Sequence, residues 1–199
     1  MACLRVGETG EEAYDVDRLF VADLIGNHET PTSTFKPLTP EVPPMSTESE
    51  AGIYARESEF LDRYVQVGVA GSRVLSVSFP ESPDEDAESE LPLLDRIQAY
   101  LEGDNDDFSD IDVAMTMPTD QRSVLESVRA VPYGEQVSVK QLTRMAAGLD
   151  PEDDDDIRLV RTALSENPAP LVIPDHRVRD GPSAAPPGVE QALRSVEGL

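Results

Sequence analysis

The sequence has very few of the residues that form disulfides and metal sites. Of its 199 residues, only Cys3 is a cysteine, and only His28 and His176 are histidines. A single cysteine excludes disulfides within the chain and cysteine-rich metal centres. The two histidines are far apart and do not have the spacing of metal ligands. We therefore expect neither a metal nor a cofactor.

Basic residues are also scarce. Lys36 and Lys140 are the only lysines, and 16 lysines and arginines stand against 40 aspartates and glutamates, for a formal net charge of −24. An acidic excess spread over the chain with almost no lysine indicates adaptation to a salty cytoplasm, as in a halophile. In molar salt the Debye length is roughly 3 Å, so a distant acidic surface repels a phosphate only weakly. The net charge therefore does not exclude nucleic acid as a partner. The charge close to a binding surface is the relevant evidence.

Long apolar runs are absent. No stretch approaches the roughly 20 residues needed to span a bilayer, and the first residues lack the charged and then apolar regions of a signal peptide. We expect a cytoplasmic monomer without membrane contact.

Composition divides the chain into three parts and predicts the α+β class. Residues 1–50 are acidic and proline-rich, which predicts a disordered or weakly ordered extension. Residues 60–112 predict a small α/β domain, with a β-hairpin formed by the alternating segments 64–69 and 74–79 and a helix over 93–101. Residues 117–199 are mostly helical.

Four helices are predicted in residues 117–199. The first three begin at residues suited to capping a helix N-terminus, which are Thr119, Ser138 in a capping box with Gln141, and Asp156. The third helix runs over 157–165. The last is predicted by the one-face spacing of Val189, Leu193 and Val196.

The helix predicted over 157–165 has two contrasting faces. Its outward stripe, at positions i, i+3, i+4 and i+7, consists of Arg158, Arg161, Thr162 and Ser165. In the second helix of a helix-turn-helix, two arginines and two hydroxyls facing outward suit a nucleic-acid groove. The alternative is a plain amphipathic helix on the protein surface.

A second feature follows directly, where an apolar run ends at Pro174. Proline fixes its own φ and favours extended geometry at Ile173, so Asp175 and His176 are expected at a rigid corner. Such a corner can hold a reactive group in place. The alternative is a buried strand that ends in an ordinary polar turn.

Three segments, Val131–Ser138, Arg158–Val178 and Glu197-Gly198, resemble the O6-alkylguanine-DNA alkyltransferases, also called methylated-DNA–protein-cysteine methyltransferases. The signature of that family is Ile-Pro-Cys-His-Arg-Val preceded by Asn-Pro. The resemblance covers residues 119–199 and extends more faintly over 60–110. It implies a small N-terminal sheet domain followed by an all-α, winged helix-turn-helix-type alkyltransferase domain.

The resemblance also implies a mechanism. In that family a buried cysteine takes the alkyl group from a flipped guanine, and a histidine and a glutamate activate the cysteine. His176 and Glu197 match this relay, Asn167 matches the asparagine that braces it, and Arg158 matches the arginine that fills the gap in the duplex. The implied lesion pocket consists of Val139, Asn167, Pro170, Asp175 and His176.

The chain departs from the family pattern in four places. Asp175 stands where the family has its cysteine, and a carboxylate is a much weaker nucleophile toward an alkyl carbon than a thiolate. Val139 replaces a tyrosine that helps to rotate the nucleotide. Residues 183–188 replace a Tyr-Ser-Gly-Gly loop. The acidic residues 151–156 lie directly before the helix expected to bind DNA, where they disfavour a phosphate.

Three hypotheses remain open. The first is a non-catalytic alkyltransferase-like protein that recognises O6-alkylguanine in double-stranded DNA by nucleotide flipping and flags it for a downstream repair protein. The second is an enzyme in which Asp175 accepts the alkyl group or activates water. The third is a diverged scaffold that no longer binds DNA. Retention of Arg158, Asn167, His176 and Glu197 favours the first.

Overall fold

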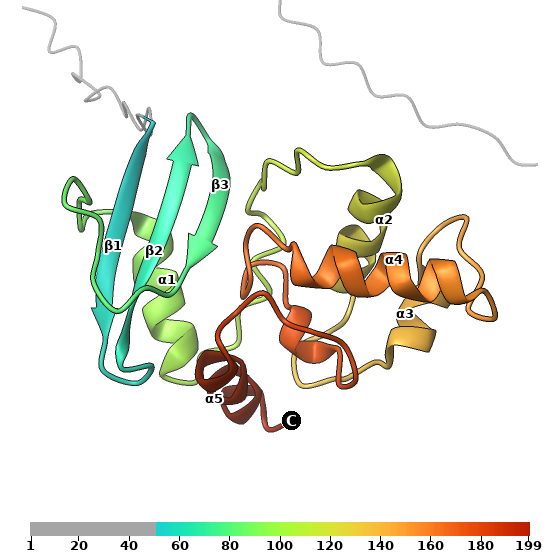
Figure 1. Ribbon diagram of the computed structural model, residues 1–199. Helices are drawn as coiled ribbons and strands as arrows, with labels where there is room; N and C mark the ends of the chain where they lie inside the picture. Colours follow the sequence, from blue (N-terminus) through green and yellow to red (C-terminus); the bar gives the residue numbers. More distant parts are fainter. Residues whose placement is uncertain (1–50) are drawn as a thin grey trace, which may run out of the picture. The chain divides into compact units, whose positions relative to one another are not determined.

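The N-terminal part of the described chain is a three-stranded antiparallel sheet (Figure 1). The computed structural model describes residues 51–199. Strands β1 (Gly52–Ser58), β2 (Arg63–Ala70) and β3 (Arg73–Ser78) pair in the order β1-β2-β3. Every second residue of β2 is buried from Val65 onward, as in a strand with one face on a core. The predicted extension over residues 1–50 lies outside the described residues.

The sequence did not predict β1, and the sheet has three strands where a two-stranded hairpin was expected. Arg56 and Glu57 interrupt the apolar alternation of β1, so its periodicity is weak. The strand forms because its backbone pairs with β2 along its full length, from Gly52 opposite Val69 to Ser58 opposite Arg63. Pairing of this kind is a tertiary effect that periodicity does not reveal.

Helix α1 (Pro92–Leu101) is the predicted helix, extended by one residue at its start. Pro92 occupies the first turn, where its missing N–H costs no hydrogen bond. Ile97 and Tyr100 are both 1% exposed. The helix packs against β1 on one side and against the C-terminal helix on another, so it links the sheet to the end of the chain.

Helices α2 (Thr119–Arg129), α3 (Val139–Met145) and α4 (Asp154–Ser165) pack against one another. The predicted capping box before α3 is confirmed. The Gln141 N–H donates to Ser138 Oγ at 3.2 Å, and the Ser138 N–H donates to Gln141 Oε1 at 2.9 Å.

The three-stranded sheet and the five helices confirm the predicted α+β class, with helices filling the C-terminal part of the described residues.

Two predicted caps were wrong. Thr119 is the first helical residue of α2 and makes no capping hydrogen bond, because the extended residue before the helix is Pro118. Helix α4 begins earlier than predicted and is capped by Asp153, whose carboxylate accepts the N–H of Asp155 at 2.8 Å. The carboxylate of Asp156 instead accepts the N–H of Asp150. In a run of four aspartates any member has the chemistry of a cap, so the loop geometry decides which one is used.

Residues 166–199 contain no named strand, and the winged helix-turn-helix arrangement stays a prediction. This part of the chain forms a 3₁₀ turn, η1 (Asp175–Arg177), and helix α5 (Pro187–Glu197). Prolines recur through the connecting segments, and proline cannot donate a hydrogen bond to a β-ladder. Helix α5 ends at Gly198, which takes the left-handed conformation (φ +72°) that glycine adopts without strain.

The sheet and the helical part are joined through the backbone of β3. The Val77 N–H donates to the Pro168 carbonyl at 2.9 Å, which places β3 beside the segment that leads to Asp175. All described residues belong to one compact unit, and the division into domains 60–112 and 117–199 stays a prediction. Within residues 51–199, no helix is long and apolar enough to cross a bilayer.

Ser138, which caps α3, and Thr119, which makes no capping bond in α2, give a matched pair of variants. Ser138→Ala removes one half of the capping box and is expected to lower the free energy of unfolding by about 1 kcal/mol. Thr119→Ala removes no capping bond and is expected to change it by less than about 0.5 kcal/mol. Urea denaturation of both variants in one buffer measures the difference. Equal destabilisation by the two substitutions would contradict these cap assignments.

Candidate functional site

Asp175 lies at a tight backbone corner. Pro174 has φ −80° and ψ 69°, and the Asp175 N–H donates to the Ile173 carbonyl at 2.8 Å. These values describe an inverse γ-turn, and the 3₁₀ turn η1 follows it directly. Leu171, at φ +84°, adds a second conformation that side chains rarely adopt. The structure therefore contains the rigid corner that Pro174 predicted.

The Asp175 carboxylate is fully buried and accepts three hydrogen bonds. Oδ1 accepts from the Ser183 hydroxyl at 2.7 Å. Oδ2 accepts from the Asn167 amide at 2.8 Å and from the Ala184 N–H at 3.0 Å. Ser183 and Ala184 belong to the loop that departs from the family pattern. The carboxylate thus holds this loop against the turn that contains Asp175.

Burial raises the pKa of Asp175 above its ordinary value, because a carboxylate loses its hydration in the interior. The hydrogen bonds from Ser183, Ala184 and Asn167 oppose the rise, since they stabilise the ionised form. Neutral donors supply all three bonds, and no arginine or lysine is among them. Asp175 is therefore a carboxylate held in place without a cationic partner.

Asn167 braces the corner from the end of α4. Its amide nitrogen donates to both the Ile173 carbonyl and the Asp175 carboxylate, and its amide oxygen accepts the Ala169 N–H at 3.1 Å. One buried side chain thereby joins the residues before and after Pro174. This position agrees with the bracing role that the resemblance implied for Asn167.

His176 contacts Glu197 at the end of α5. The His176 Nε2 to Glu197 Oε1 distance is 3.0 Å, and both side chains are fully buried. Burial alone would raise the pKa of Glu197, but hydrogen bonds from His176, Arg177, Tyr100 and the Gly134 N–H lower it far below its ordinary range. Glu197 is therefore ionised, and His176 Nε2 carries the proton that it donates. The other ring nitrogen, Nδ1, is buried and has no hydrogen-bond partner.

Two residues of this cluster were missed by reasoning from the sequence. Arg177 is buried, donates Nε and Nη2 to the Glu197 carboxylate, and donates Nη1 to the Val131 carbonyl. Tyr100, from α1, donates its hydroxyl to Glu197 Oε1 at 2.6 Å. Arg177 could have been identified from its place in the His-Arg-Val block. The sequence around Tyr100 shows only the apolar spacing of a core residue, which does not indicate a role in the site.

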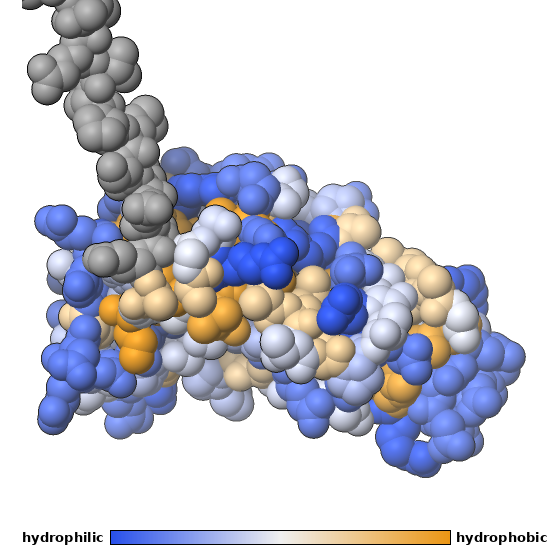
Figure 2. Space-filling view, turned by 90° about the horizontal axis from the view of Figure 1, so that it is seen from above, coloured by the Kyte–Doolittle hydropathy of each residue, from blue (hydrophilic) through white to orange (hydrophobic). Residues whose placement is uncertain are grey.

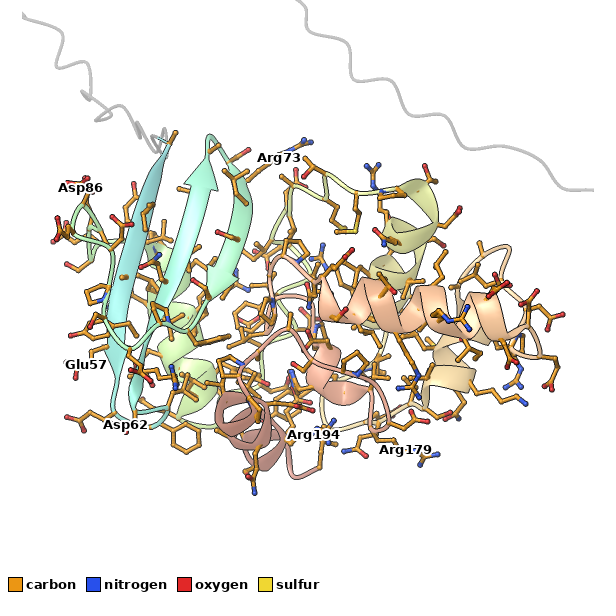
Figure 3. The ribbon with its side chains drawn as sticks, in the orientation of Figure 1. Glu57, Asp62, Arg73, Asp86, Arg179 and Arg194 are labelled. Carbon is orange, nitrogen blue, oxygen red and sulfur yellow. The ribbon has the colours of Figure 1, made fainter. Side chains whose placement is uncertain are left out.

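Arg194 fixes the backbone of the same turn from outside. Its guanidinium lies beside η1 in Figure 3, and Nε donates to the His176 carbonyl at 2.9 Å while Nη2 donates to the Val178 carbonyl at 3.2 Å. The turn is thus held by an arginine on its surface and by Asn167 beneath it. The side chains at 175 and 176 have little freedom to rearrange.

A cavity of about 300 Å³ adjoins the corner. It is lined by the end of β3 and the residues after it, and by residues of the helical part, which are Val77–Pro80, Asn167, Pro170, Ala184 and Pro186. Two members of the predicted lesion pocket, Asn167 and Pro170, line it. Its apolar wall and its few polar groups are typical of a small-molecule or base pocket.

The other three members of the predicted lesion pocket do not line this cavity. Val139, Asp175 and His176 are buried. Val139 packs in the core at the start of α3, where its N–H donates to Asp180 Oδ1 at 2.6 Å. Asp175 is covered by the Ser183-Ala184 segment. A short side chain and a loop that bonds to Asp175 explain why the predicted set is divided.

The four predicted DNA-contacting side chains share the outer face of α4. Arg158 pairs with Asp155 and its side chain is 73% exposed, whereas Arg161 donates to the Asp180 carbonyl at 2.8 Å. The hydroxyls of Thr162 and Ser165 donate to carbonyls of their own helix. The face is thus accessible, and its donors bind protein acceptors.

Acidic residues lie beside that face. Lys140 pairs with Glu152 at 2.6 Å, which fixes the acidic loop to α3. Figure 2 shows hydrophilic residues covering the end of the molecule where α4 begins. The loop lies at the start of the helix, and the Arg158–Ser165 stripe continues away from it.

Comparison with known proteins identifies the family. The family model for the DNA-binding domain of 6-O-methylguanine DNA methyltransferase matches residues 119–186. A methylated-DNA–protein-cysteine methyltransferase of Metallosphaera sedula is 33% identical over 114 residues, which is 56% of this chain and 69% of that protein. The chain belongs to the 6-O-methylguanine DNA methyltransferase family.

Another relative in this family has a different name. A protein of Thermus thermophilus that is named a DNA base-flipping protein is 35% identical over 117 residues, which is 58% of this chain and 75% of that protein. The fold agrees as well. A crystal structure of a variant of the Mycobacterium tuberculosis O6-methylguanine methyltransferase has a TM-score of 0.60 at 21% identity, over 73% of this chain and 92% of that one.

The raised pKa of Asp175 gives a test of its burial. Asp175→Asn keeps all three hydrogen bonds, because the amide oxygen accepts from Asn167 and Ala184 while the amide N–H donates to Ser183. When folding raises the pKa of a carboxyl group, that group loses its proton at a lower pH in the unfolded chain than in the folded protein. The stability of the wild type therefore falls as the pH rises above about 3.9, the reference value for aspartate.

The Asp175→Asn variant has no ionisable group at residue 175, so its stability does not fall for this reason as the pH rises. We expect it to be more stable than the wild type at pH 7, on the order of 1 kcal/mol, and the two to converge near pH 3.5. Urea unfolding at a series of pH values measures the difference. A variant less stable than the wild type at pH 7 would show that the charge at residue 175 is stabilising.

Proposed function

We propose that this protein is a non-catalytic member of its family that binds O6-alkylguanine in double-stranded DNA by nucleotide flipping and acts in DNA repair. The observation that carries the proposal is the buried Asp175 carboxylate at the acceptor position, within a relay that is otherwise complete. Asn167 binds this carboxylate, and the adjacent His176 pairs with Glu197, as the family's mechanism implies for the matching residues. These contacts support a site that keeps the His176–Glu197 pair and lacks the family's thiol.

The chemistry of Asp175 argues against alkyl transfer to the carboxylate. A carboxylate is a weaker nucleophile toward carbon than a thiolate. Its lone pairs here are engaged by Ser183, Asn167 and Ala184, and the side chain is fully buried behind the loop. The same contacts leave no open path for water to approach it. The enzyme hypothesis therefore has less support than recognition.

The cavity beside Asn167 supports base recognition. A volume of about 300 Å³ next to the corner is suited to a planar base, with Pro170 and Pro186 as apolar walls and the Asn167 side chain as a polar group. Flipping a base costs a few kcal/mol of unstacking and unpairing, which the contacts in such a pocket must offset. The alkyl group of O6-alkylguanine adds apolar surface that a proline-lined wall accommodates.

The outer face of α4 supports DNA binding. The ion pair of Arg158 with Asp155 is solvent-exposed, and such pairs contribute only about 0–1 kcal/mol, so a phosphate or a gap in the base stack can compete for the arginine. The acidic loop lies at one end of the face rather than across it. These contacts favour DNA binding over the scaffold hypothesis. The Thermus relative's name, a DNA base-flipping protein, points the same way.

The proposal extends to the setting of the protein. A binder that does not repair the base has to flag it for a downstream repair protein, so we include such a partner and a monomeric, cytoplasmic protein in the proposal. A solved structure of a Mycobacterium tuberculosis family member in complex with DNA, with a TM-score of 0.58 over 73% of this chain, supports DNA as the ligand.

Fluorescence anisotropy with two matched duplexes tests the proposal. One duplex carries a single O6-methylguanine and the other carries guanine at that position, in the same high-salt buffer. We expect tighter binding of the methylated duplex, and we expect Arg158→Ala to weaken it roughly tenfold, within the range for loss of one DNA-contacting arginine. Arg73→Ala is the control, because Arg73 is also an exposed arginine with one carboxylate partner but lies on the sheet.

Equal affinity of the wild type for the two duplexes would contradict lesion recognition. No binding to either duplex would favour the scaffold hypothesis. Equal losses in the Arg158→Ala and Arg73→Ala variants would show that α4 is not the DNA face.

A further inference from the structure

Tyr100 is a buried contact between α1 and the His176–Glu197 pair. The tyrosine is 1% exposed, its hydroxyl donates to Glu197 Oε1 at 2.6 Å, and the same hydroxyl lies 3.4 Å from His176 Nε2. Helix α1 belongs to the sheet side of the molecule, whereas His176 and Glu197 belong to the C-terminal part. One hydroxyl therefore connects the relay to the other side of the fold.

We propose that Tyr100 is a positioning residue for this site, which holds Glu197 so that His176 keeps its proton on Nε2 and presents an unprotonated Nδ1. This proposal rests on the proposed function only for the role of the positioned histidine in binding the lesion. Its structural content, the tautomer of His176, is independent of DNA.

The hydrogen-bond directions around Glu197 carry the argument. An ionised carboxylate only accepts, so Tyr100, Arg177 and His176 must all donate to it. Burial and then the bond to Glu197 raise the pKa of Tyr100, so its hydroxyl keeps its proton and always donates. Oε1 receives all three donors, and Arg177 Nε and the Gly134 N–H bind Oε2, so Glu197 has a single orientation toward the imidazole.

Aromatic packing fixes the hydroxyl of Tyr100 in turn. Its ring makes edge-on contacts with Phe108 and Tyr133, at centroid distances of 5.5 and 6.0 Å. Such contacts restrict rotation of the ring, so the hydroxyl cannot follow a displaced glutamate. Tyr133 itself donates to the Val196 carbonyl at 3.1 Å and not to Glu197. It is therefore a neighbour of the same size and chemistry without the proposed role.

The consequence of this arrangement concerns His176 Nδ1. This nitrogen is buried and has no partner among the protein groups described. A fixed Nε2–H tautomer makes it a hydrogen-bond acceptor inside the site, on the residue next to Asp175. Through Glu197, Tyr100 thereby contributes to keeping His176 Nδ1 an acceptor inside the site.

Nuclear magnetic resonance of the ring nitrogens tests the proposal directly. The chain has only two histidines, so uniform ¹⁵N labelling of histidine gives signals from His28 and His176 alone. In the wild type we expect the Nε2–H tautomer of His176 to exceed the Nδ1–H tautomer by roughly tenfold or more, the bias that one charge-assisted hydrogen bond supplies. A wild-type His176 with its proton on Nδ1 would overturn the proposal without any variant.

Two phenylalanine variants separate positioning from packing. Tyr100→Phe removes one of the donors that hold Glu197 Oε1, where Arg177 Nη2 remains, and is expected to raise the share of the minor Nδ1–H tautomer of His176. Tyr133→Phe removes a hydroxyl of equal size nearby and is expected to leave the His176 signals unchanged. Identical signals in the wild type and Tyr100→Phe, or equal changes in both variants, would refute the positioning role.

Binding to the methylated duplex distinguishes this proposal from the proposed function. We expect Tyr100→Phe to weaken that binding roughly fivefold, the effect of losing one hydrogen bond, with a smaller effect for Tyr133→Phe. If the share of the minor tautomer rises as expected but the wild type does not prefer methylated DNA, the proposed function fails and the positioning role stands. If the preference holds but the tautomer does not respond to Tyr100→Phe, the positioning role fails alone.

Discussion

The buried carboxylate of Glu197 is the group on which the rest of the site depends. Arg177 supplies the opposite charge, and His176, Tyr100 and the Gly134 N–H complete its hydrogen bonds. A carboxylate taken out of water is costly unless its lone pairs are satisfied in this way. Because its donors come from α1, from the loop before α3 and from η1, the carboxylate also fixes these three segments together.

Asp175 shows what happens when the residue next to this cluster changes. His176 pairs with Glu197 and Asn167 braces the turn, while the side chain at 175 accepts bonds from the Ser183-Ala184 loop. In the proposed function, Asp175 thus turns the position that carries the nucleophile in the family into a structural one. A cavity beside Asn167 remains accessible from the outside of this closed corner, which suits recognition without transfer.

Local chemistry predicted part of this structure, and long-range contacts determined the rest. The capping box at Ser138, the helix around Arg158 and the corner at Pro174 depend on neighbouring residues, so the sequence reveals them. Strand β1 depends on pairing with β2, and Tyr100 depends on a partner 97 positions away, so periodicity could not reveal them. The cavity also combines β3 with the C-terminal loop, which no local pattern brings together.

Restoring the nucleophile tests the central claim most directly, since the account holds that this site kept a lesion pocket and a DNA face after losing its nucleophile. Asp175→Cys is incubated with a duplex whose O6-methylguanine carries a labelled methyl group, with the wild type and its Cys3 as the control. The account predicts that label appears on the variant protein and not on the wild type. A variant that folds and binds the methylated duplex but leaves all label on the DNA would contradict it.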